Sequence, residues 1–292
     1  MEIRVLRYFL EAAREENISK AAQKLNVTQP TMSKQLKDLE YELGQKLFTR
    51  TNYRIKLTAE GHLLKKRAED IVNLTDRTLA EFKSAQETYE GDIDIGCPET
   101  PSIKYLARAV KSIQKEHPRI RCNLHSGNLA DVTERLDKGL LDFAFVMDYV
   151  DLAKYAYLDI PAQDIWGVIM RKDDPLSRQK SLSVKELYHL PLICSRQGIN
   201  IDFPKWFGSD LDSLNIVATF NLSYNAFIMV REGIGYAVSY DRLADTYENS
   251  DLKFIPIENI PPSNMKLVWR KTQVFSPIAA LLLEELKKEQ PS

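Results

Sequence analysis

The sequence of 292 residues predicts a multi-domain protein in which an α-helical domain precedes an α/β domain. Three observations carry this prediction. Short helical patterns and a hairpin fill residues 1–58, one long helical pattern fills residues 59–90, and short β-rich runs separated mostly by helical stretches follow Gly91. We therefore expect two domains, at 1–58 and 91–292, joined by a helix at 59–90.

Three short helices are predicted in the N-terminal domain. Ser19 is a plausible cap of the second helix, and Thr28 or Gln29 opens the third, whose first turn tolerates Pro30 and whose end is marked by Gly44. The apolar residues recur at helical spacing. Those expected in the core are Leu6, Phe9, Leu10 and Ala13, then Ala21, Ala22 and Leu25, then Met32, Leu36, Leu39 and Leu43.

A β-hairpin follows these helices. Its two strands are predicted at 47–50 and 54–57, around the polar turn Thr51-Asn52-Tyr53. We interpret this hairpin as a wing beside the third helix.

The next helix is predicted to begin at Thr58 and to run to about Gln86, longer than most globular helices. Its apolar residues alternate by four and three, which is typical of a coiled-coil seam and implies a partner helix. Packing of the same stripe against its own chain is the alternative, because Thr75 and Thr78 are weak seam residues. The side chains expected to dimerise are Leu64, Ala68, Ile71 and Phe82.

The N-terminal region is basic, although the formal net charge of the chain is only -1. Residues 17–67 carry 11 Lys and Arg against 4 Asp and Glu, whereas residues 91–292 carry 24 against 27. Such a stretch suits the phosphate backbone of a nucleic acid, and a solvated helical surface is the alternative explanation.

From Gln29 to Lys37, the face of the third helix that points away from the core offers amides, hydroxyls and ammonium groups and has no apolar anchor. Amides and lysines read base edges in the major groove, and hydroxyls hold phosphates. Two arginines of the hairpin lie within reach of the DNA backbone or minor groove. The candidate DNA-binding residues are Ser19, Thr28, Gln29, Pro30, Thr31, Ser33, Lys34, Gln35, Lys37, Arg50 and Arg54.

The β-rich runs of the second domain are often continuously apolar, as expected for strands buried on both faces of a parallel sheet. They lie at 93–96, 120–125, 143–147, 166–170, 190–194, 216–220, 236–239 and 252–257.

About the first 65 residues carry a long, ordered set of residues with specific spacing. They are Ala21-Ala22, Leu25-Asn26-Val27-Thr28-Gln29-Pro30, Ser33, Leu36, Leu39-Glu40, Leu43-Gly44, Leu47-Phe48, Arg50, Leu57-Thr58 and Gly61. In this set the N-terminal part of the chain resembles the LysR-type transcriptional regulators. Later in the chain, Glu116-His117-Pro118 and Gly233-Ile234-Gly235 fall where that family has a helix-ending proline and a late glycine pair.

This resemblance implies a winged helix-turn-helix domain, a linker helix and a periplasmic-binding-protein-like effector domain. The two lobes of that domain would lie at about 91–160 with 266–292, and at 161–265. The implied function is a transcriptional regulator that binds double-stranded promoter DNA as a homodimer or homotetramer and contacts RNA polymerase. A small molecule would bind between the lobes, and its closing of the cleft would change the DNA complex.

Strand ends and the helix starts after them are natural sites for a small ligand. Thr100 and Ser102 offer hydroxyls there, and Arg196 would pair with a carboxylate, whereas Glu99 favours a zwitterion, a cation or a hydroxylated molecule. Ordinary helix capping is the alternative role of these polar residues. The candidate effector-binding residues are Glu99, Thr100, Pro101, Ser102, Asn128, Ser195, Arg196, Gln197, Asn221 and Ser223.

No catalytic motif is present, and the four histidines lack metal-ligand spacing, so we expect no enzyme activity, no cofactor and no metal. The odd number of cysteines, Cys97, Cys122 and Cys194, fits no disulfide framework, and a redox role for Cys97 is a weaker alternative. The N-terminus lacks a signal peptide pattern and no apolar run spans a bilayer, so we expect a cytoplasmic protein without a membrane partner.

Two rival functions stay open at this point. In the first, a solute-binding protein uses its N-terminal helices only for assembly. In the second, a regulator senses no ligand because its cleft is filled by side chains.

Overall fold

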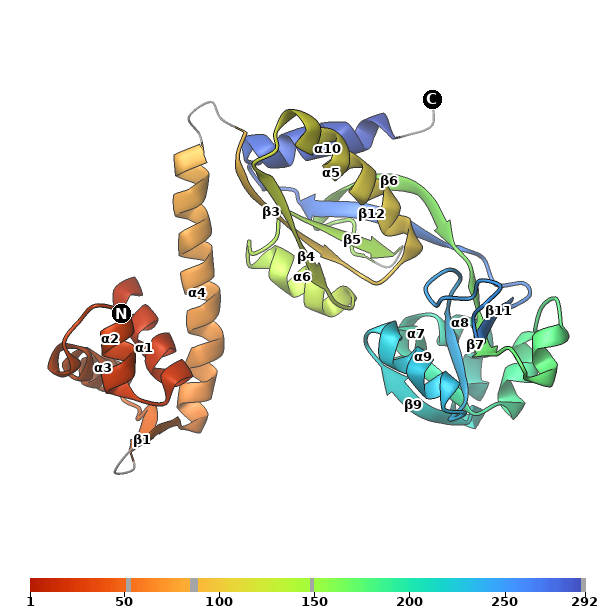
Figure 1. The fold of residues 1–292 in the computed structure, drawn as a ribbon, viewed down its shortest axis with the longest axis horizontal. Helices are drawn as coiled ribbons and strands as arrows, with labels where there is room; N and C mark the ends of the chain where they lie inside the picture. The colour runs from red at the N-terminus through yellow and green to blue at the C-terminus, as the bar shows by residue number, and fades with distance from the viewer. Residues whose placement is uncertain (51–53, 85–88, 148–149, 290–292) are drawn as a thin grey trace. The chain divides into compact units, whose positions relative to one another are not determined.

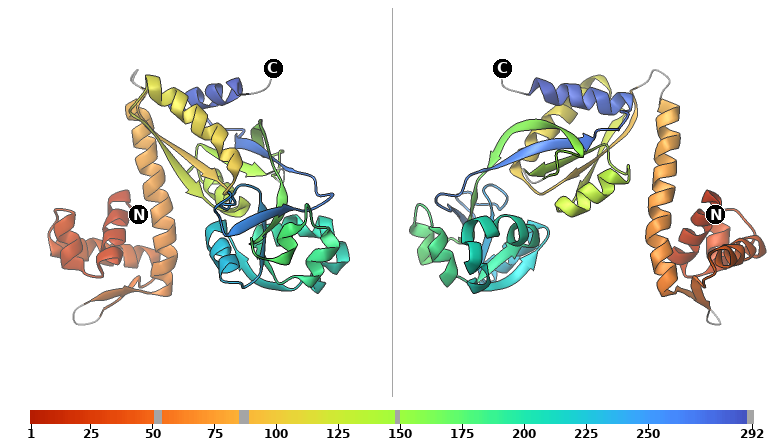
Figure 2. Two further views of the ribbon diagram at one scale, coloured as in Figure 1. Left: turned by 45° about the vertical axis from the view of Figure 1, so that its right-hand side comes forward. Right: turned by 180° about the vertical axis from the view of Figure 1, so that it is seen from behind.

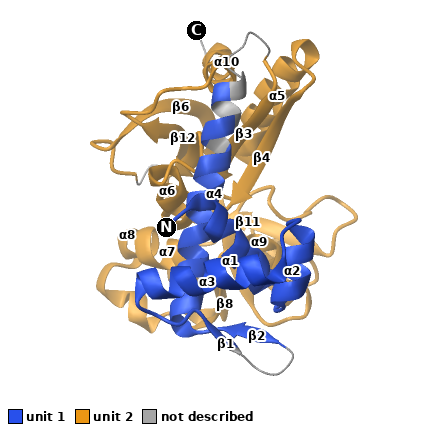
Figure 3. Cartoon of the chain, turned by 90° about the vertical axis from the view of Figure 1, so that its left-hand side faces the viewer, with its two compact units in different colours: residues 1–83 blue, residues 84–292 orange. Residues whose placement is uncertain are grey.

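The computed structural model describes residues 1–50, 54–84, 89–147 and 150–289. The chain forms two compact units, Met1–Lys83 and Ser84–Ser292 (Figure 3). The boundaries predicted at residues 58 and 90 stay predictions.

The first unit contains the three predicted helices, α1 (Ile3–Glu15), α2 (Ile18–Lys24) and α3 (Gln29–Leu43). Thr28 is the N-cap of α3, and Gly44 ends the helix at φ 65°, a left-handed conformation that glycine adopts without strain. Two predictions were wrong in detail. Asn17, not Ser19, caps α2 by accepting a hydrogen bond from the backbone N–H of Lys20 at 3.0 Å, and Leu43 is 39 % exposed.

The predicted hairpin is present as β1 (Phe48–Arg50) and β2 (Ile55–Leu57), which pair antiparallel. Its predicted turn, Thr51-Asn52-Tyr53, lies outside the described residues. The hairpin is held on the helices by Phe48, whose ring centroid lies 5.3 Å from that of Phe9 in α1. This contact makes the hairpin and the helices one core.

A buried carboxylate connects α3 to the hairpin. Glu40 is 6 % exposed, and its Oε1 accepts hydrogen bonds from the backbone N–H groups of Leu47 at 2.9 Å and Phe48 at 3.3 Å. Its Oε2 accepts from Lys46 Nζ at 3.1 Å. Burial alone would raise the pKa of Glu40, but these hydrogen bonds outweigh burial and lower it. The carboxylate is therefore ionised at neutral pH, and both of its oxygens accept hydrogen bonds.

The long helix α4 spans Ala59–Ser84, and the four residues after it lie outside the described part. The Thr58 hydroxyl accepts a hydrogen bond from the backbone N–H of Gly61 at 2.9 Å, as expected for a cap. A Cβ at Gly61 would lie 2.2 Å from the carbonyl oxygen of Leu47, so only glycine lets the helix start this close to the hairpin.

The predicted seam of α4 is divided between two environments. Ala68 is 0 % exposed, and with Val72 it belongs to the core of the first unit, against which Leu64 and Ile71 also pack. The expectation that Ala68 faces a partner chain is therefore corrected, because its own chain covers it. Phe82 is 79 % exposed.

The second unit contains two lobes, each built on one sheet (Figure 1). The first sheet has the order β4-β3-β5-β12-β6, in which β3 runs parallel to β4 and β5, and β12 runs antiparallel to β5 and β6. Its strands are β3 (Gly91–Cys97), β4 (Ile120–Ser126), β5 (Phe143–Met147), β6 (Tyr155–Asp164) and β12 (Ser263–Arg270).

Helices cover both faces of this sheet. Figure 2 shows α5 (Lys104–Glu116) and α10 (Pro277–Lys288) on one side and α6 (Leu129–Asp137) on the other. Strand β5 serves both faces, because Phe143 and Phe145 pack with α5 and α10 while Ala144 and Val146 pack with α6. This arrangement explains why the sequence of β5 is continuously apolar.

The second sheet has the order β11-β7-β10-β8-β9, with β8 parallel to β9 and β10, and β7 antiparallel to β10 and β11. Its strands are β7 (Trp166–Arg171), β8 (Leu192–Ser195), β9 (Ile216–Phe220), β10 (Tyr236–Tyr240) and β11 (Leu252–Pro256). The helices of this lobe are α7 (Arg196–Ile201), α8 (Phe203–Phe207) and α9 (Ser223–Arg231), and its 3-10 turns lie at Pro175–Arg178, Val184–His189 and Gly208–Ser213. A further 3-10 turn, Pro101–Ile103, follows β3 in the first lobe.

The prediction of parallel sheets was partly wrong, because both sheets are mixed. Two strands were also missed, β6 with 10 residues and β12 with 8. They pair antiparallel with each other: β6 leads from the first lobe toward the second, and β12 leads back (Figure 1).

We predict that Glu40→Ala lowers the free energy of unfolding of the first unit by about 2 kcal/mol, because two buried backbone N–H groups lose a charged acceptor. Chemical denaturation followed by circular dichroism measures this change. Asp38→Ala is the matched control, since Asp38 is exposed on the same helix, and its effect should stay within about 0.5 kcal/mol. Equal effects of the two substitutions would contradict the role assigned to Glu40.

Candidate nucleic-acid interface and ligand cleft

The N-terminal part of α3 presents most of the predicted DNA-binding side chains to solvent. Thr28, Gln29, Pro30, Thr31, Lys34 and Lys37 are exposed, whereas Ser33 and Gln35 are half-buried. Met32 and Leu36 on the opposite face are buried in the core, so the helix is fixed with this polar face outward. Its face offers amide, hydroxyl and ammonium groups together, which suits base edges and phosphates.

Basic residues of α2 and of the hairpin flank α3 in the sequence, and they differ in exposure and in ion pairing. Ser19 is exposed on α2 beside Lys20, an exposed cation that the sequence interpretation did not include. Arg54 precedes β2 with 71 % of its side chain exposed, and it forms an ion pair with Glu16 at 3.8 Å. Arg50 ends β1, but its side chain lies outside the described part.

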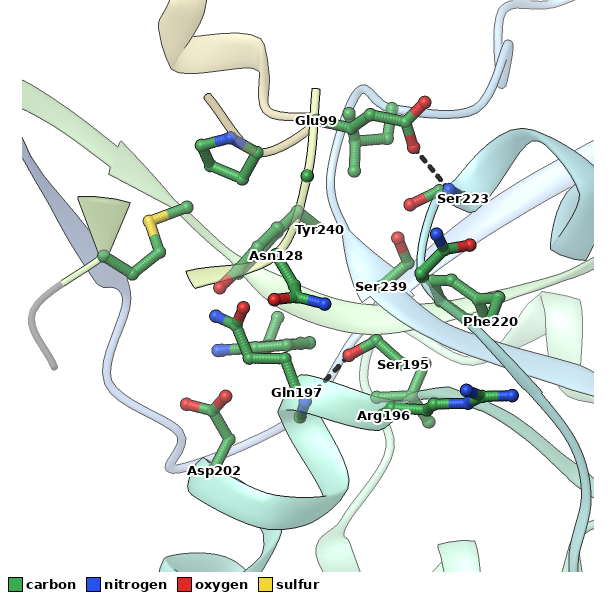
Figure 4. A pocket seen from close by; sticks show the side chains of 18 residues that line it. Glu99, Asn128, Ser195, Arg196, Gln197, Asp202, Phe220, Ser223, Ser239 and Tyr240 are labelled. Carbon is green, nitrogen blue, oxygen red and sulfur yellow. Dashed lines mark hydrogen bonds between the residues drawn. The ribbon is translucent and has the colours of Figure 1, made fainter. Parts of the chain in front are cut away.

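The second unit has a cavity where the carboxyl ends of parallel strands from both lobes meet. Residues that follow β3, β4, β8 and β9 line it, and Tyr240 at the end of β10 closes one side (Figure 4). The cavity volume is about 80 Å³. Of the predicted effector residues, those that line it are Glu99, Asn128, Ser195, Arg196, Gln197, Asn221 and Ser223.

Thr100, Pro101 and Ser102 do not line this cavity. Thr100 and Ser102 are buried, and their hydroxyls donate hydrogen bonds to Asp164, from Ser102 Oγ at 2.7 Å. The Thr100 hydroxyl also accepts from the backbone N–H of Ser102 at 3.0 Å. A carboxylate of the chain already uses these hydroxyls, and Thr100 lines a neighbouring cavity, so the expectation that they meet a ligand stays a prediction.

Asp164 explains this arrangement. It is 1 % exposed, and burial raises its pKa, although the hydrogen bonds from Thr100 and Ser102 act to lower it. Its position at the end of β6 lies more than 60 residues from those hydroxyls, so no local pattern in the sequence connects them.

Several lining residues were missed by the sequence interpretation. Ser239 and Tyr240 end a parallel strand, so the strand-end argument that found Ser195 applies to them too. Trp166 begins β7, which runs antiparallel to β10 and therefore brings its first residue to the same edge. The remaining lining residues that were not predicted include Met147, Asp202, Phe220 and Leu243.

The polar side chains of the cleft are mostly engaged with the protein itself. Asn128 Oδ1 accepts from the backbone N–H of Asp131 at 3.0 Å, and Ser195 Oγ accepts from that of Gly198 at 2.9 Å. Arg196 Nε donates to Thr219 Oγ1 at 3.4 Å. Helix capping, the alternative considered for these residues, is therefore one of their roles.

The cysteines are poor nucleophiles. Burial raises the pKa of Cys97, that of Cys122 to about 11 and that of Cys194 to about 12, so each thiol is protonated at neutral pH. Among the described residues, no group of His, Cys, Asp and Glu side chains is arranged to hold a metal ion. None of the described helices is long and apolar enough to cross a membrane.

Comparison with known families assigns both units. Residues 3–62 match the model of the bacterial regulatory helix-turn-helix proteins of the lysR family, and residues 86–291 match that of the LysR substrate binding domain. The chain belongs to the LysR family. Relatives include the uncharacterized regulator YvbU of Bacillus subtilis, 27 % identical over 82 % of this chain and 81 % of that protein, and YnfL of Escherichia coli, 24 % identical over 96 % and 95 %.

Solved structures share the fold along the whole chain. The LysR family regulator CbnR in complex with its target DNA aligns with a TM-score of 0.76 at 21 % identity, over 99 % of this chain and 100 % of that one. Full-length BenM aligns with a TM-score of 0.54 at 22 % identity, over 99 % and 96 %. The predicted fold class, a winged helix-turn-helix domain with a linker helix and a two-lobed α/β domain, is confirmed.

We predict that Thr100→Val destabilises the second unit by about 2 kcal/mol at neutral pH, because the buried Asp164 carboxylate loses a donor. The folded-state pKa of Asp164 lies above its unfolded value of about 3.9, so this loss should shrink as the pH falls through the folded-state pKa. Thermal denaturation across a pH series measures both effects. Thr133→Val, which removes a hydroxyl bonded to Leu129 O within α6, should change stability by less than about 0.5 kcal/mol.

Proposed function

We propose that this LysR family protein is a sequence-specific DNA-binding transcriptional regulator whose activity at promoters is controlled by a small molecule bound between its two lobes. The observation that carries the proposal is the exposed polar start of α3, with Gln29, Thr31 and Lys34. The buried side of the same helix shares a core with the hairpin. The recognition helix of a helix-turn-helix contacts base edges with these N-terminal positions.

The rival function, a solute-binding protein whose N-terminal helices serve only assembly, is not favoured. An assembly surface would offer apolar anchors, and the outward face of α3 is polar where the prediction places DNA. The helix-turn-helix model matches residues 3–62, and CbnR, which has this fold, was solved with its target DNA. The names of the relatives are those of transcriptional regulators, not enzymes.

Pairing of two chains through α4 is part of the proposal. Part of α4 packs in the core of its own unit, but other positions along the helix leave large apolar residues exposed. These are Leu63, Leu74, Leu79 and Phe82, with exposed fractions from 42 % to 79 %. A second copy that covers them would place two recognition helices on the half-sites of a pseudo-palindromic operator. Tetramers and contact with RNA polymerase are further proposals from the family resemblance.

We predict that Gln29→Ala weakens binding to the operator by about tenfold, because one amide contact to a base contributes about 1–3 kcal/mol. DNase footprinting on the DNA upstream of the gene, at two salt concentrations, measures this. Gln45→Ala is the matched control, an exposed amide just beyond the opposite end of α3, and it should bind as the native protein does. Arg50→Ala should weaken binding to all sequences and reduce the salt dependence. Equal, weak binding of native protein to any duplex would reject the proposed function.

We predict that Leu79→Glu converts the dimer into monomers, because a charge in the centre of an apolar helix pair is desolvated without a partner. Analytical ultracentrifugation measures the association constant, which should fall at least tenfold. Asn73→Glu adds the same charge at another exposed position of α4 and is the control. An unchanged association constant for the leucine variant would place the dimer interface elsewhere.

A further inference from the structure

Two hydrogen bonds cross the cleft in opposite directions. Glu99, in the loop after β3 of the first lobe, accepts with Oε2 from the backbone N–H of Ser223, the first residue of α9 in the second lobe (Figure 4). Gln197, in α7 of the second lobe, accepts with Oε1 from the backbone N–H of Leu129, the first residue of α6 in the first lobe, at 2.8 Å. Each lobe therefore supplies a side chain to a helix start of the other.

The backbone N–H groups that donate to Glu99 and Gln197 are at helix starts, where anionic ligands commonly bind. The first N–H groups of a helix have no partner within the helix, and the helix dipole favours negative charge there. Leu222, which precedes α9, gives no side-chain cap, and Asn128 caps α6 at Asp131 and leaves Leu129 without one. Glu99 and Gln197 thus supply from across the cleft what a ligand carboxylate or carbonyl supplies in an open site.

The small volume of the cavity between the lobes is consistent with a cleft that the protein's own side chains close. Its volume of about 80 Å³ is well below the 300–1,000 Å³ of ordinary ligand pockets. Beyond Glu99 and Ser223 lies a second cavity of about 330 Å³, which Cys97, Phe227 and Leu243 also line. Pro98, Glu99, Ser223 and Leu243 line both cavities, so the two spaces adjoin beside the contact between Glu99 and Ser223.

We propose that Glu99 and Gln197 are internal ligands that keep the lobes closed in the effector-free protein, and that the effector carries a carboxylate that replaces Glu99 at the start of α9. This proposal rests on the proposed role of the cleft as the effector site. The exchange of one carboxylate for another keeps a negative charge at the helix start. Entry of the effector then separates the lobes and joins the two cavities, whereas the family resemblance suggested that an effector closes an open cleft.

The test measures hydrogen exchange of the full-length protein without DNA, by mass spectrometry of peptides that contain the two amides. Glu99→Ala should speed exchange of the Ser223 amide at least tenfold and, because the lobes part, speed that of Leu129 as well. Gln197→Ala should have the reciprocal effect. Glu99→Gln keeps an acceptor and is the matched control, with both amides slow. The amides of β8 and β10 report the fold of the second lobe and should stay protected in every variant.

Chemical rescue tests the ligand class. Acetate at millimolar concentration should restore slow exchange at Ser223 in the Glu99→Ala variant, whereas methylammonium and chloride at the same ionic strength should not. Restoration by methylammonium instead of acetate would overturn the carboxylate assignment. Unchanged exchange at Leu129 in the Glu99→Ala variant, or loss of protection in β8 and β10, would overturn the closure. Because DNA is absent, these outcomes are independent of the footprint that tests the proposed function.

Discussion

The antiparallel pair of β6 and β12 is the constraint on which the second unit depends. The two strands pair from Tyr155 with Arg270 to Asp164 with Ser263, and both members of that last pair are buried and bond to other elements. Asp164 accepts hydrogen bonds from two hydroxyls of the first lobe, and Ser263 Oγ accepts from Trp166 Nε1 of the second at 3.0 Å. The pair of Asp164 and Ser263 is therefore bonded to both lobes. Any relative motion of the lobes must bend the two strands near this pair.

In the first unit, α4 connects the elements in the way that β6 and β12 connect the two lobes. Ala68 and Val72 belong to the same core as the recognition helix, and Thr58 donates to Lys46 O at 2.6 Å while it caps α4. Glu40 holds the hairpin to α3 in that core. The base of α4, the hairpin and α3 therefore behave as one body, so that in the proposed dimer a change in the pairing of α4 would reorient the polar face of α3.

Local signals in the sequence predicted α3 well, because its cap, its first-turn proline and its final glycine are all short-range features. The same kind of signal failed for β6 and β12. Their half-exposed, antiparallel sequences lack the continuous apolar run of a buried parallel strand, and Pro161 lies within β6. Pairing of strands about 100 residues apart leaves no trace in a window of a few residues.

The cleft illustrates the same limit at the level of single side chains. Strand ends predicted Ser195, Arg196 and Gln197 correctly as lining residues, because that geometry follows from the α/β fold. The roles of Thr100 and Ser102 depend on Asp164, and the role of Glu99 depends on Ser223 in the other lobe. A polar residue at a helix start therefore indicates a hydrogen bond, whereas only the tertiary structure decides whether the partner is a ligand or the chain itself.

Closure by internal side chains has a consequence for how sharply the protein responds. A hydrogen bond with a charged partner contributes about 1.5–3 kcal/mol and a neutral one about 0.5–1.5 kcal/mol. Two such bonds of about 2–4.5 kcal/mol together favour the closed lobes by about 30- to 2,000-fold. An effector must bind the open form more tightly by more than this factor before the open form becomes the major one. The strength of the Glu99 and Gln197 contacts would then set the concentration at which the regulator responds.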